Sequence, residues 1–153
     1  MATVTATRAA AAYPVPNTGI LRVAHGSYTH ATNLAAATII EYCRVPKGAV
    51  VVGGWWGGAD LDTGTEELDI DIGWAANGVD VADPDGLGNL DVITGDVSVH
   101  VGAAGIWVPL QGTILTSGPL TFGAETTLQA VINVDAATGG TGVTSMVVYF
   151  YVP

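Results

Sequence analysis

The sequence has little charge for its length, and this scarcity limits what the protein can do. Charged residues make up 12% of the 153 residues, whereas an ordinary soluble domain has about 25%. The mean hydropathy is +0.44, so a domain of this size cannot hide all of its apolar side chains within itself. Because large exposed apolar patches are rare on monomers, we expect part of this surface to lie against another chain.

Positive charge is missing from most of the sequence. All four cations lie within the first 47 residues: Arg8, Arg22, Arg44 and Lys47. That segment holds one acid, Glu41, and carries a net +3, whereas the remainder holds 13 acids and no Lys or Arg, which gives the chain a net −10. Nucleic-acid binding needs a basic face, so this composition argues against it. The net negative charge can simply keep the protein soluble. Alternatively, the mildly basic N-terminal segment docks on an acidic partner.

Cysteine and long apolar runs are also scarce. The single cysteine, Cys43, excludes an intrachain disulfide, and its strand-like surroundings favour a buried, inert thiol over a nucleophile. The N-terminus lacks the apolar core of a signal peptide. Prolines and glycines interrupt the uncharged stretch 101–124, which argues against a membrane span. We therefore expect a soluble protein that is made without secretion and has no membrane partner.

Glycine, threonine and valine dominate what is present, and they indicate short strands joined by turns. The 21 glycines, together with many Thr and Val, favour β-structure over long helices. Short strands at regular spacing predict an all-β, single-domain β-sandwich of about eight strands, with a jelly roll favoured. Residues 18–153 should form this sandwich and residues 1–17 an extended N-terminal arm. Strands are expected at 20–29, 37–45, 49–56, 68–74, 96–101, 105–110, 112–116, 126–134 and 145–152.

Several local patterns carry specific expectations. Alternation over 68–74 predicts a half-buried strand whose core-facing side chains are Leu68, Ile70, Ile72 and Trp74. The Asn77-Gly78 pair that follows predicts a type I′ hairpin turn. The polar stretch 82–95 should be a loop with a short helical turn at 86–93. The run 145–152 is apolar on both faces, so it should be a central strand or one whose second face meets a partner.

Two acidic motifs could carry chemistry. Asp62-Thr63-Gly64 matches the triplet of aspartic proteases, but further acids follow it and oppose the buried setting that a raised carboxyl pKa requires. The second motif is a candidate calcium site, because calcium takes six to eight oxygens, and its acids are Asp80, Asp83, Asp85 and Asp91. The EF-hand pattern fails there, since its first and last positions would fall on Val81 and Val92. An acidic loop and a plain turn are favoured, and no cofactor is expected.

The aromatic residues allow two interpretations. Trp55, Trp56, Trp74 and Trp107 could form a sugar-stacking platform, but Trp74 lies on the apolar face of its strand. For the others, core or subunit interface is favoured over sugar, and the subunit-interface candidates are Trp55, Trp56, Tyr149 and Tyr151. The three histidines are too scattered for a metal site. No phosphate loop, dinucleotide fingerprint or nucleophile elbow is present, so we expect no enzyme.

The sequence resembles the small capsid decoration (cement) proteins of tailed bacteriophages. Three features carry the resemblance: the Ala/Thr arm over 1–17, the run Ile70-Asp71-Ile72-Gly73 before the acidic loop 80–91, and the pair 127–134 and 146–152 joined by 136–142. The similarity spans most of the chain and concerns architecture, without an invariant motif. It implies a sandwich or barrel that commonly trimerises, sits at threefold positions on the outside of the head and clamps neighbouring capsid subunits.

The resemblance also implies partners and a location. The partners would be the major capsid protein and further copies of the same chain, on the outer surface of a virion assembled in the host cytoplasm. Burial of apolar surface between chains would hold the subunits together, and the N-terminal arm could add a strand to a sheet of a neighbouring subunit. The candidates for capsid contacts are the cations Arg8, Arg22, Arg44 and Lys47. Another virion component, such as a head-fibre or tail part, and a carbohydrate-binding module remain open.

Overall fold

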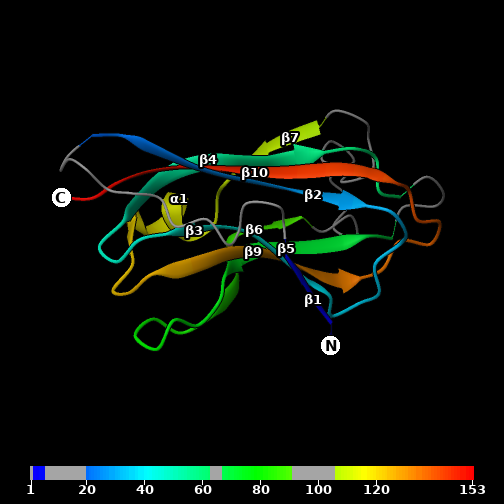
Figure 1. Ribbon diagram of the computed structural model, residues 1–153, viewed down its shortest axis with the longest axis horizontal. Helices are drawn as coiled ribbons and strands as arrows, with labels where there is room; N and C mark the ends of the chain where they lie inside the picture. The colour runs from blue at the N-terminus through cyan, green and yellow to red at the C-terminus, as the bar shows by residue number, and fades with distance from the viewer. Residues whose placement is uncertain (1, 6–19, 63–66, 91–105) are drawn as a thin grey trace.

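The computed structural model describes residues 2–5, 20–62, 67–90 and 106–153, and it shows an all-β sandwich (Figure 1). Residues 6–17 of the predicted arm and the predicted strand 96–101 lie outside the described residues. The described part of the chain forms ten strands and one short helix, α1 (Thr113–Ser117). The strands are β1 (Thr3–Thr5), β2 (Arg22–His30), β3 (Ile39–Val45), β4 (Val50–Gly58), β5 (Asp69–Trp74), β6 (Asp83–Leu90), β7 (Ile106–Pro109), β8 (Leu120–Thr121), β9 (Thr126–Val134) and β10 (Gly142–Tyr151).

Two sheets pack face to face, as the two layers in Figure 1 show, and the chain passes back and forth between them. The first sheet has the strand order β1-β3-β9-β5-β6, and the second has the order β2-β10-β4-β7, with β8 paired to β4. Strands β2 to β5 alternate between the sheets, and so do β9 and β10. Apart from the β1–β3 pair, the strands of both sheets are antiparallel. Two sheets connected in this way form a jelly roll, which confirms the predicted fold class. Thr3–Thr5, from the predicted arm, adds β1 in parallel to β3.

Apolar side chains from both sheets meet between the layers. Ile70, Ile72 and Trp74 of β5 are buried, as their alternation predicts, while Asp69 and Asp71, which point to the other side, are only half-buried. The opposite sheet contributes Met146, Val148 and Phe150 of β10, all fully buried. Strand β10 lies between β2 and β4, so the C-terminal run is the central strand that its apolar composition predicts.

Within the predicted loop 82–95, the described residues 83–90 do not form a loop or a helical turn. Residues 83–90 form β6, an edge strand that pairs with β5. One of the glycines that make this stretch resemble a loop has a packing reason: a Cβ atom at Gly86 would lie 2.3 Å from the Trp74 ring. Only glycine allows a strand to pass this close to an indole.

The predicted hairpin turn at Asn77-Gly78 is also wrong. Strands β5 and β6 do pair, but residues 75–82 connect them as a longer loop. The side-chain carbonyl of Asn77 accepts hydrogen bonds from the backbone N–H groups of Val79, at 2.9 Å, and Asp80, at 2.6 Å. Asparagine therefore shapes this loop with its side chain and not as part of a two-residue turn.

The predicted strand 112–116 is instead the helix α1. Gly112 and Gly118 flank the helix with φ angles of 60° and 86°, in the left-handed region that favours glycine. These two glycines turn the chain into and out of a single helical segment between β7 and β8. Within the described ranges, no helix has both the length and the apolar character needed to cross a membrane.

Candidate interaction surfaces

The outer face of the β2-β10-β4-β7 sheet is made of uncharged side chains. Val147 of β10 lies opposite His25 on one side and Trp55 on the other, and Trp55 lies opposite Pro109. Since every second residue of a strand points to the same side, this row identifies the outward set. Its described members are Val23, His25, Ser27, Thr29, Val52, Trp55, Trp107, Pro109, Val143, Ser145, Val147, Tyr149 and Tyr151. None of these is Asp, Glu, Lys or Arg, and we call this surface the uncharged face.

Several apolar side chains of the uncharged face are open to solvent. Val23 and Trp107 are each 47% exposed, Val143 is 46% exposed and Trp55 is 42% exposed. Leu21, just before β2, is 61% exposed. Large exposed apolar patches on a folded domain mark sites of interaction, so this face is the principal candidate site of the molecule.

Three aromatic side chains cross the uncharged face in a diagonal line. Trp107 of β7 lies opposite Gly57, two residues after Trp55, and Tyr149 of β10 lies opposite Gly53, two residues before Trp55. Each step along the line therefore moves by one strand and two residues, about 7–8 Å between Cα atoms. Aromatic side chains reach across such diagonals, so the line forms a hydrophobic ridge across three strands.

Trp56 does not lie where the interface hypothesis placed it. Its side chain is only 3% exposed and belongs to the core. Neighbouring residues of a strand point to opposite sides, so the outward position of Trp55 turns Trp56 inward. Of the four interface candidates, Trp55, Tyr149 and Tyr151 lie on the uncharged face, and Trp56 is a core residue.

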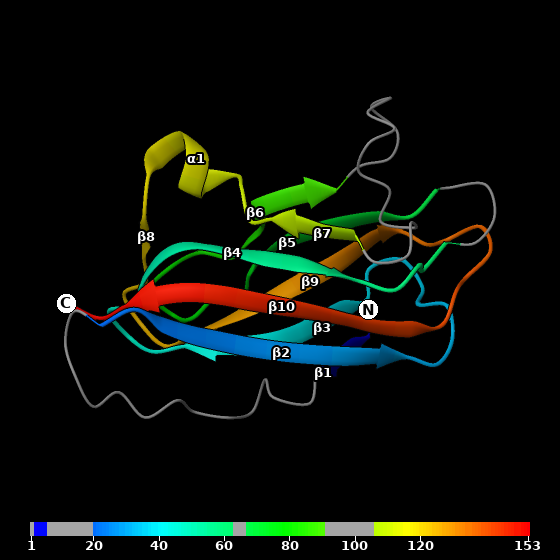
Figure 2. The same cartoon turned by 90° about the horizontal axis from the view of Figure 1, so that it is seen from above.

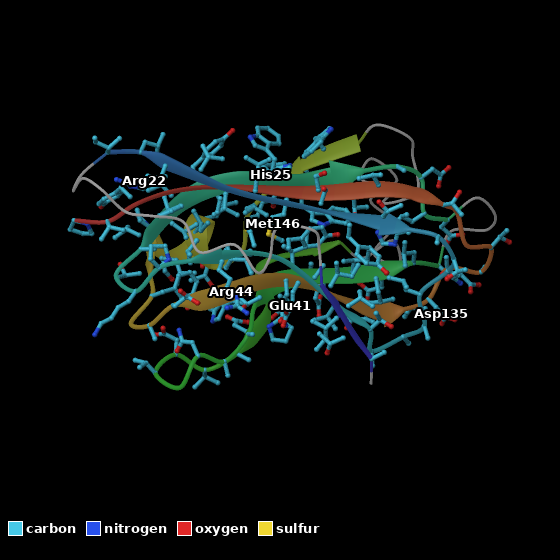
Figure 3. The ribbon with its side chains drawn as sticks, in the orientation of Figure 1. Arg22, His25, Glu41, Arg44, Asp135 and Met146 are labelled. Carbon is cyan, nitrogen blue, oxygen red and sulfur yellow. The ribbon has the colours of Figure 1, made fainter. Side chains whose placement is uncertain are left out.

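The outer face of the other sheet is polar and acidic. Glu41 of β3 lies opposite Gln129 of β9, and Asp71 of β5 lies opposite Asn89 of β6. Asp69 adds a further acid at the start of β5. The sandwich therefore has two unlike faces, one acidic and one uncharged (Figure 3 shows Glu41 on the first and His25 on the second).

The three described cations lie at one end of the sandwich. Arg22 begins β2 and pairs with Phe150 near the C-terminus, while Arg44 and Lys47 lie near and in the turn from β3 to β4. Figure 3 places Arg22 and Arg44 toward this end and Asp135 at the opposite one. We call it the cationic end. The remaining capsid-contact candidate, Arg8, lies outside the described residues.

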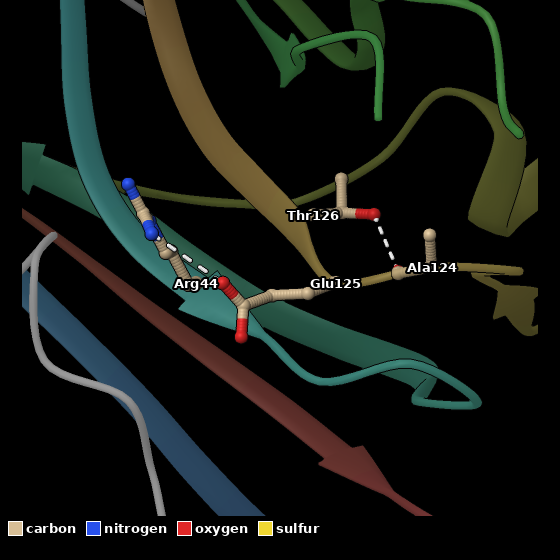
Figure 4. Close-up of polar contacts among 4 residues, drawn as sticks. All are labelled: Arg44, Ala124, Glu125 and Thr126. Atoms are coloured by element: carbon tan, nitrogen blue, oxygen red, sulfur yellow. Dashed lines mark hydrogen bonds and ion pairs between the residues drawn. The ribbon is translucent and has the colours of Figure 1, made fainter. Parts of the chain in front are cut away.

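The Arg44 side chain has an acidic neighbour at the cationic end. Its guanidinium Nη1 lies 3.4 Å from Glu125 Oε1, and the two side chains are 40% and 52% exposed (Figure 4). Beside this pair, the Thr126 hydroxyl donates to the Ala124 carbonyl at 3.0 Å and fixes the start of β9. An exposed ion pair of this kind contributes little to stability, so Arg44 can exchange Glu125 for a partner's carboxylate.

The described acids of the calcium hypothesis lie on two segments, with Asp80 in the 75–82 loop and Asp83 and Asp85 on β6. Asp80 accepts hydrogen bonds from the Asn77 side chain, at 2.6 Å, and from the Gly123 N–H, at 2.8 Å, and so closes the 75–82 loop. Burial and the neighbouring Asp85 raise the pKa of Asp83 on β6. Asp91 lies outside the described residues. In the part of the chain that the structure describes, no three His, Cys, Asp or Glu side chains are grouped to hold a metal.

Asp62, the acid of the protease-like triplet, bonds the backbone just before β5. Its carboxylate accepts hydrogen bonds from the N–H groups of Glu67, at 2.8 Å, and Leu68, at 3.2 Å. The side chain is 3% exposed, and Thr63 and Gly64 lie outside the described residues. The candidate nucleophile, Cys43, is fully buried, and this burial raises its thiol pKa to about 12, so the thiol is protonated and inert.

A buried polar cluster joins β2, β3 and β10 inside the sandwich. His30 Nε2 lies 2.8 Å from the Thr144 hydroxyl, which also bonds the Tyr42 hydroxyl. Burial lowers the pKa of His30 from 6.5 to about 4 and raises the pKa of Tyr42 from 10 to about 12. Both side chains are therefore neutral near pH 7, which suits a cluster that shares hydrogen bonds without charge.

Acidification should destabilise the protein through His30. The unfolded chain protonates this histidine near pH 6.5 and the folded chain only near pH 4, so between these values the free energy of unfolding falls as the pH falls. We expect the wild type to lose at most about 3 kcal/mol over this window through this group. The His30→Gln variant, which can keep the bond to Thr144, should lack that component. Denaturant titrations from pH 7 to pH 4 measure it, and parallel pH profiles for the two proteins would contradict the assignment.

Neither a protein-family model nor a curated protein matches the sequence, but solved structures share the fold. A chain in the capsid of Ralstonia phage GP4 superposes with a TM-score of 0.74 at 20% identity, over 99% of both chains. A chain in the capsid asymmetric unit of Cyanophage Pam1 gives 0.67 at 21% identity, over 96% of this chain and 95% of the other. The acidic stable capsid structure of Helicobacter pylori bacteriophage KHP30 contains a third, with 0.60 at 12% identity over 90% and 91%. From end to end, the protein has the fold of chains found in three phage capsids.

Proposed function

We propose that the protein is a non-enzymatic structural component of a bacteriophage virion that binds the outer surface of the capsid. The end-to-end fold match carries the proposal. The matched chains of the GP4 and Pam1 capsids are themselves covered over 99% and 95% of their length, so each is a sandwich of about this size. A separate small sandwich in a capsid fits a subunit that is added to the shell.

The positions of the cationic end and of the acidic face suggest how the protein would bind the capsid. The cationic end would dock on acidic side chains of the major capsid protein through Arg22, Arg44 and Lys47, with Arg8 reaching the same partner. The acidic face and the opposite end would then point to solvent. Copies of the chain, assembled as a trimer at threefold positions, would clamp neighbouring capsid subunits and stabilise the shell.

Removing the cations should weaken capsid binding. In the variant Arg8→Gln, Arg22→Gln, Arg44→Gln and Lys47→Gln, we expect affinity for capsids that lack the protein to fall about tenfold or more at moderate salt, because charge pairs at an interface set recognition. Co-sedimentation with such capsids measures this, with the melting temperature as a check on folding.

A matched control neutralises acids at the opposite end. Glu67→Gln with Asp135→Asn should leave capsid binding unchanged, although it alters the net charge in the opposite direction. Full binding by the four-cation variant would overturn the role of the cationic end. A wild-type protein that does not bind capsids at all would overturn the proposed function and favour a head-fibre or tail component.

A further inference from the structure

We infer that the uncharged face is the surface on which a second copy of this chain docks, side by side with the first. The inference goes beyond the proposed function, since a contact between like faces joins copies in pairs and is distinct from the contacts that would close a trimer. Its test uses the purified protein alone, so it can fail while capsid binding stands.

Electrostatics restricts where two copies can meet. Each chain carries a net charge of −10, and exposed charges interact over about 8 Å at physiological ionic strength. On the polar sheet face, Glu41, Asp69 and Asp71 would confront the same acids of a second copy. The uncharged face places no like charges opposite one another, so two copies can approach there without repulsion or the desolvation of unpaired charge.

The side chains on the uncharged face favour a protein over a glycan. The core of a protein interface is depleted in charged residues and enriched in Trp and Tyr, which describes the line Trp107, Trp55 and Tyr149. Around the line lie the aliphatic side chains Val23, Val52, Val143 and Val147. Recognition of sugar hydroxyls relies on directed polar groups, but the described residues of this face include no Asn, Gln, Asp or Glu.

The size of the face is sufficient for a modest interface. Strands lie about 4.8 Å apart and rise about 3.3 Å per residue, so three long strands and the short β7 cover roughly 500 Å² in projection. Two such faces approach the roughly 1,000 Å² that specific association requires. We therefore expect association that depends on protein concentration and that a single charge on the face can abolish.

The orientation of the face relates it to the proposed capsid contact. The face runs along the length of the sandwich, whereas the cationic end closes one end of it (Figure 2). Sheets that pack face to face keep their strands nearly aligned. Two copies packed with parallel long axes would present both cationic ends on the same side, as docking on one shell requires.

The test is the concentration dependence of mass in solution. Sedimentation of the wild type up to about 1 mM should show a mass above 15.5 kDa that rises with concentration. The variant Trp55→Glu, which places like charges across the interface, should remain a monomer. Val23→Glu is a second variant on the same face in case Trp55→Glu does not fold. The control Asn133→Glu adds the same charge to an exposed site of the opposite sheet and should associate like the wild type.

Each other occupant of the face gives a distinct result. A wild type that stays monomeric overturns the inference, as does a Trp55→Glu variant that associates normally. If the monomer changes its tryptophan fluorescence when a soluble bacterial polysaccharide is added, the face binds glycans. If the wild type is monomeric and Trp55→Glu loses capsid binding while folded, the face meets the shell itself.

Discussion

Replacing Gly26 with alanine should destabilise the sandwich strongly, although it adds only one methyl group. A Cβ atom at this position would lie 1.8 Å from the Tyr42 carbonyl oxygen and 2.5 Å from its carbonyl carbon. Gly26 belongs to β2 and Tyr42 to β3, which lie in different sheets. The two backbones therefore touch with no side chain between them, and neither can rotate away from the new atom.

The expected size of the effect follows from packing. Overpacking a close-packed interior costs about 1–3 kcal/mol, and more where backbone must shift, so we expect a loss of at least about 3 kcal/mol in the free energy of unfolding. For a chain of this length, that corresponds to a fall in melting temperature of about 10 °C. Thermal and urea unfolding measure both quantities.

The control for Gly26→Ala is Ser27→Ala on the same strand. Ser27 points outward on the uncharged face, so its replacement should change the free energy of unfolding by no more than about 0.5 kcal/mol. Equal stability of the two variants would mean that the backbones of β2 and β3 do not come into direct contact at Gly26.

The strands that the sequence predicts well are those whose own residues decide their structure. Strand β9 has the predicted bounds, and β5 buries the predicted alternate residues, because a period of two is a local property. The stretch 83–90 escapes prediction because its Pro and Gly residues normally mark turns, whereas Gly86 is required by Trp74, a residue of the partner strand. When a residue is required by a side chain that packs on it from another strand, the neighbouring residues in the sequence do not reveal why it is there.

The candidate surfaces are even harder to predict from the sequence than the strands. Trp55, Trp107 and Tyr149 are far apart in the sequence, and only the strand order brings them into one line. His30 and Thr144 bond across 114 positions, for the same reason. The uneven charge is visible from the sequence, but the gathering of Arg22, Arg44 and Lys47 at one end depends on how β2 and the β3–β4 turn meet in space.

The adjacent residues Trp55 and Trp56 should respond to mutation in opposite ways. Trp56 is buried in the core, and replacing such a residue with alanine costs about 3–5 kcal/mol, because transfer energy is lost and a cavity remains. Trp55 is 42% exposed, so Trp55→Ala should change the free energy of unfolding by no more than about 1 kcal/mol. Denaturant unfolding of the two variants, followed by circular dichroism, measures this difference.

The effects on self-association should be the opposite: Trp55→Ala should weaken it more than Trp56→Ala does. Trp55 is the middle of the aromatic line, and central aromatic residues carry much of the binding energy of an interface. We expect Trp55→Ala to weaken self-association about tenfold or more, while folded Trp56→Ala, which keeps the line intact, should associate nearly like the wild type. If Trp56→Ala alone reduced association while folded, the contact would depend on the shape of the core, and the uncharged face would not be the docking surface. The paired variants therefore separate the side chain that holds one sandwich together from the one that joins two.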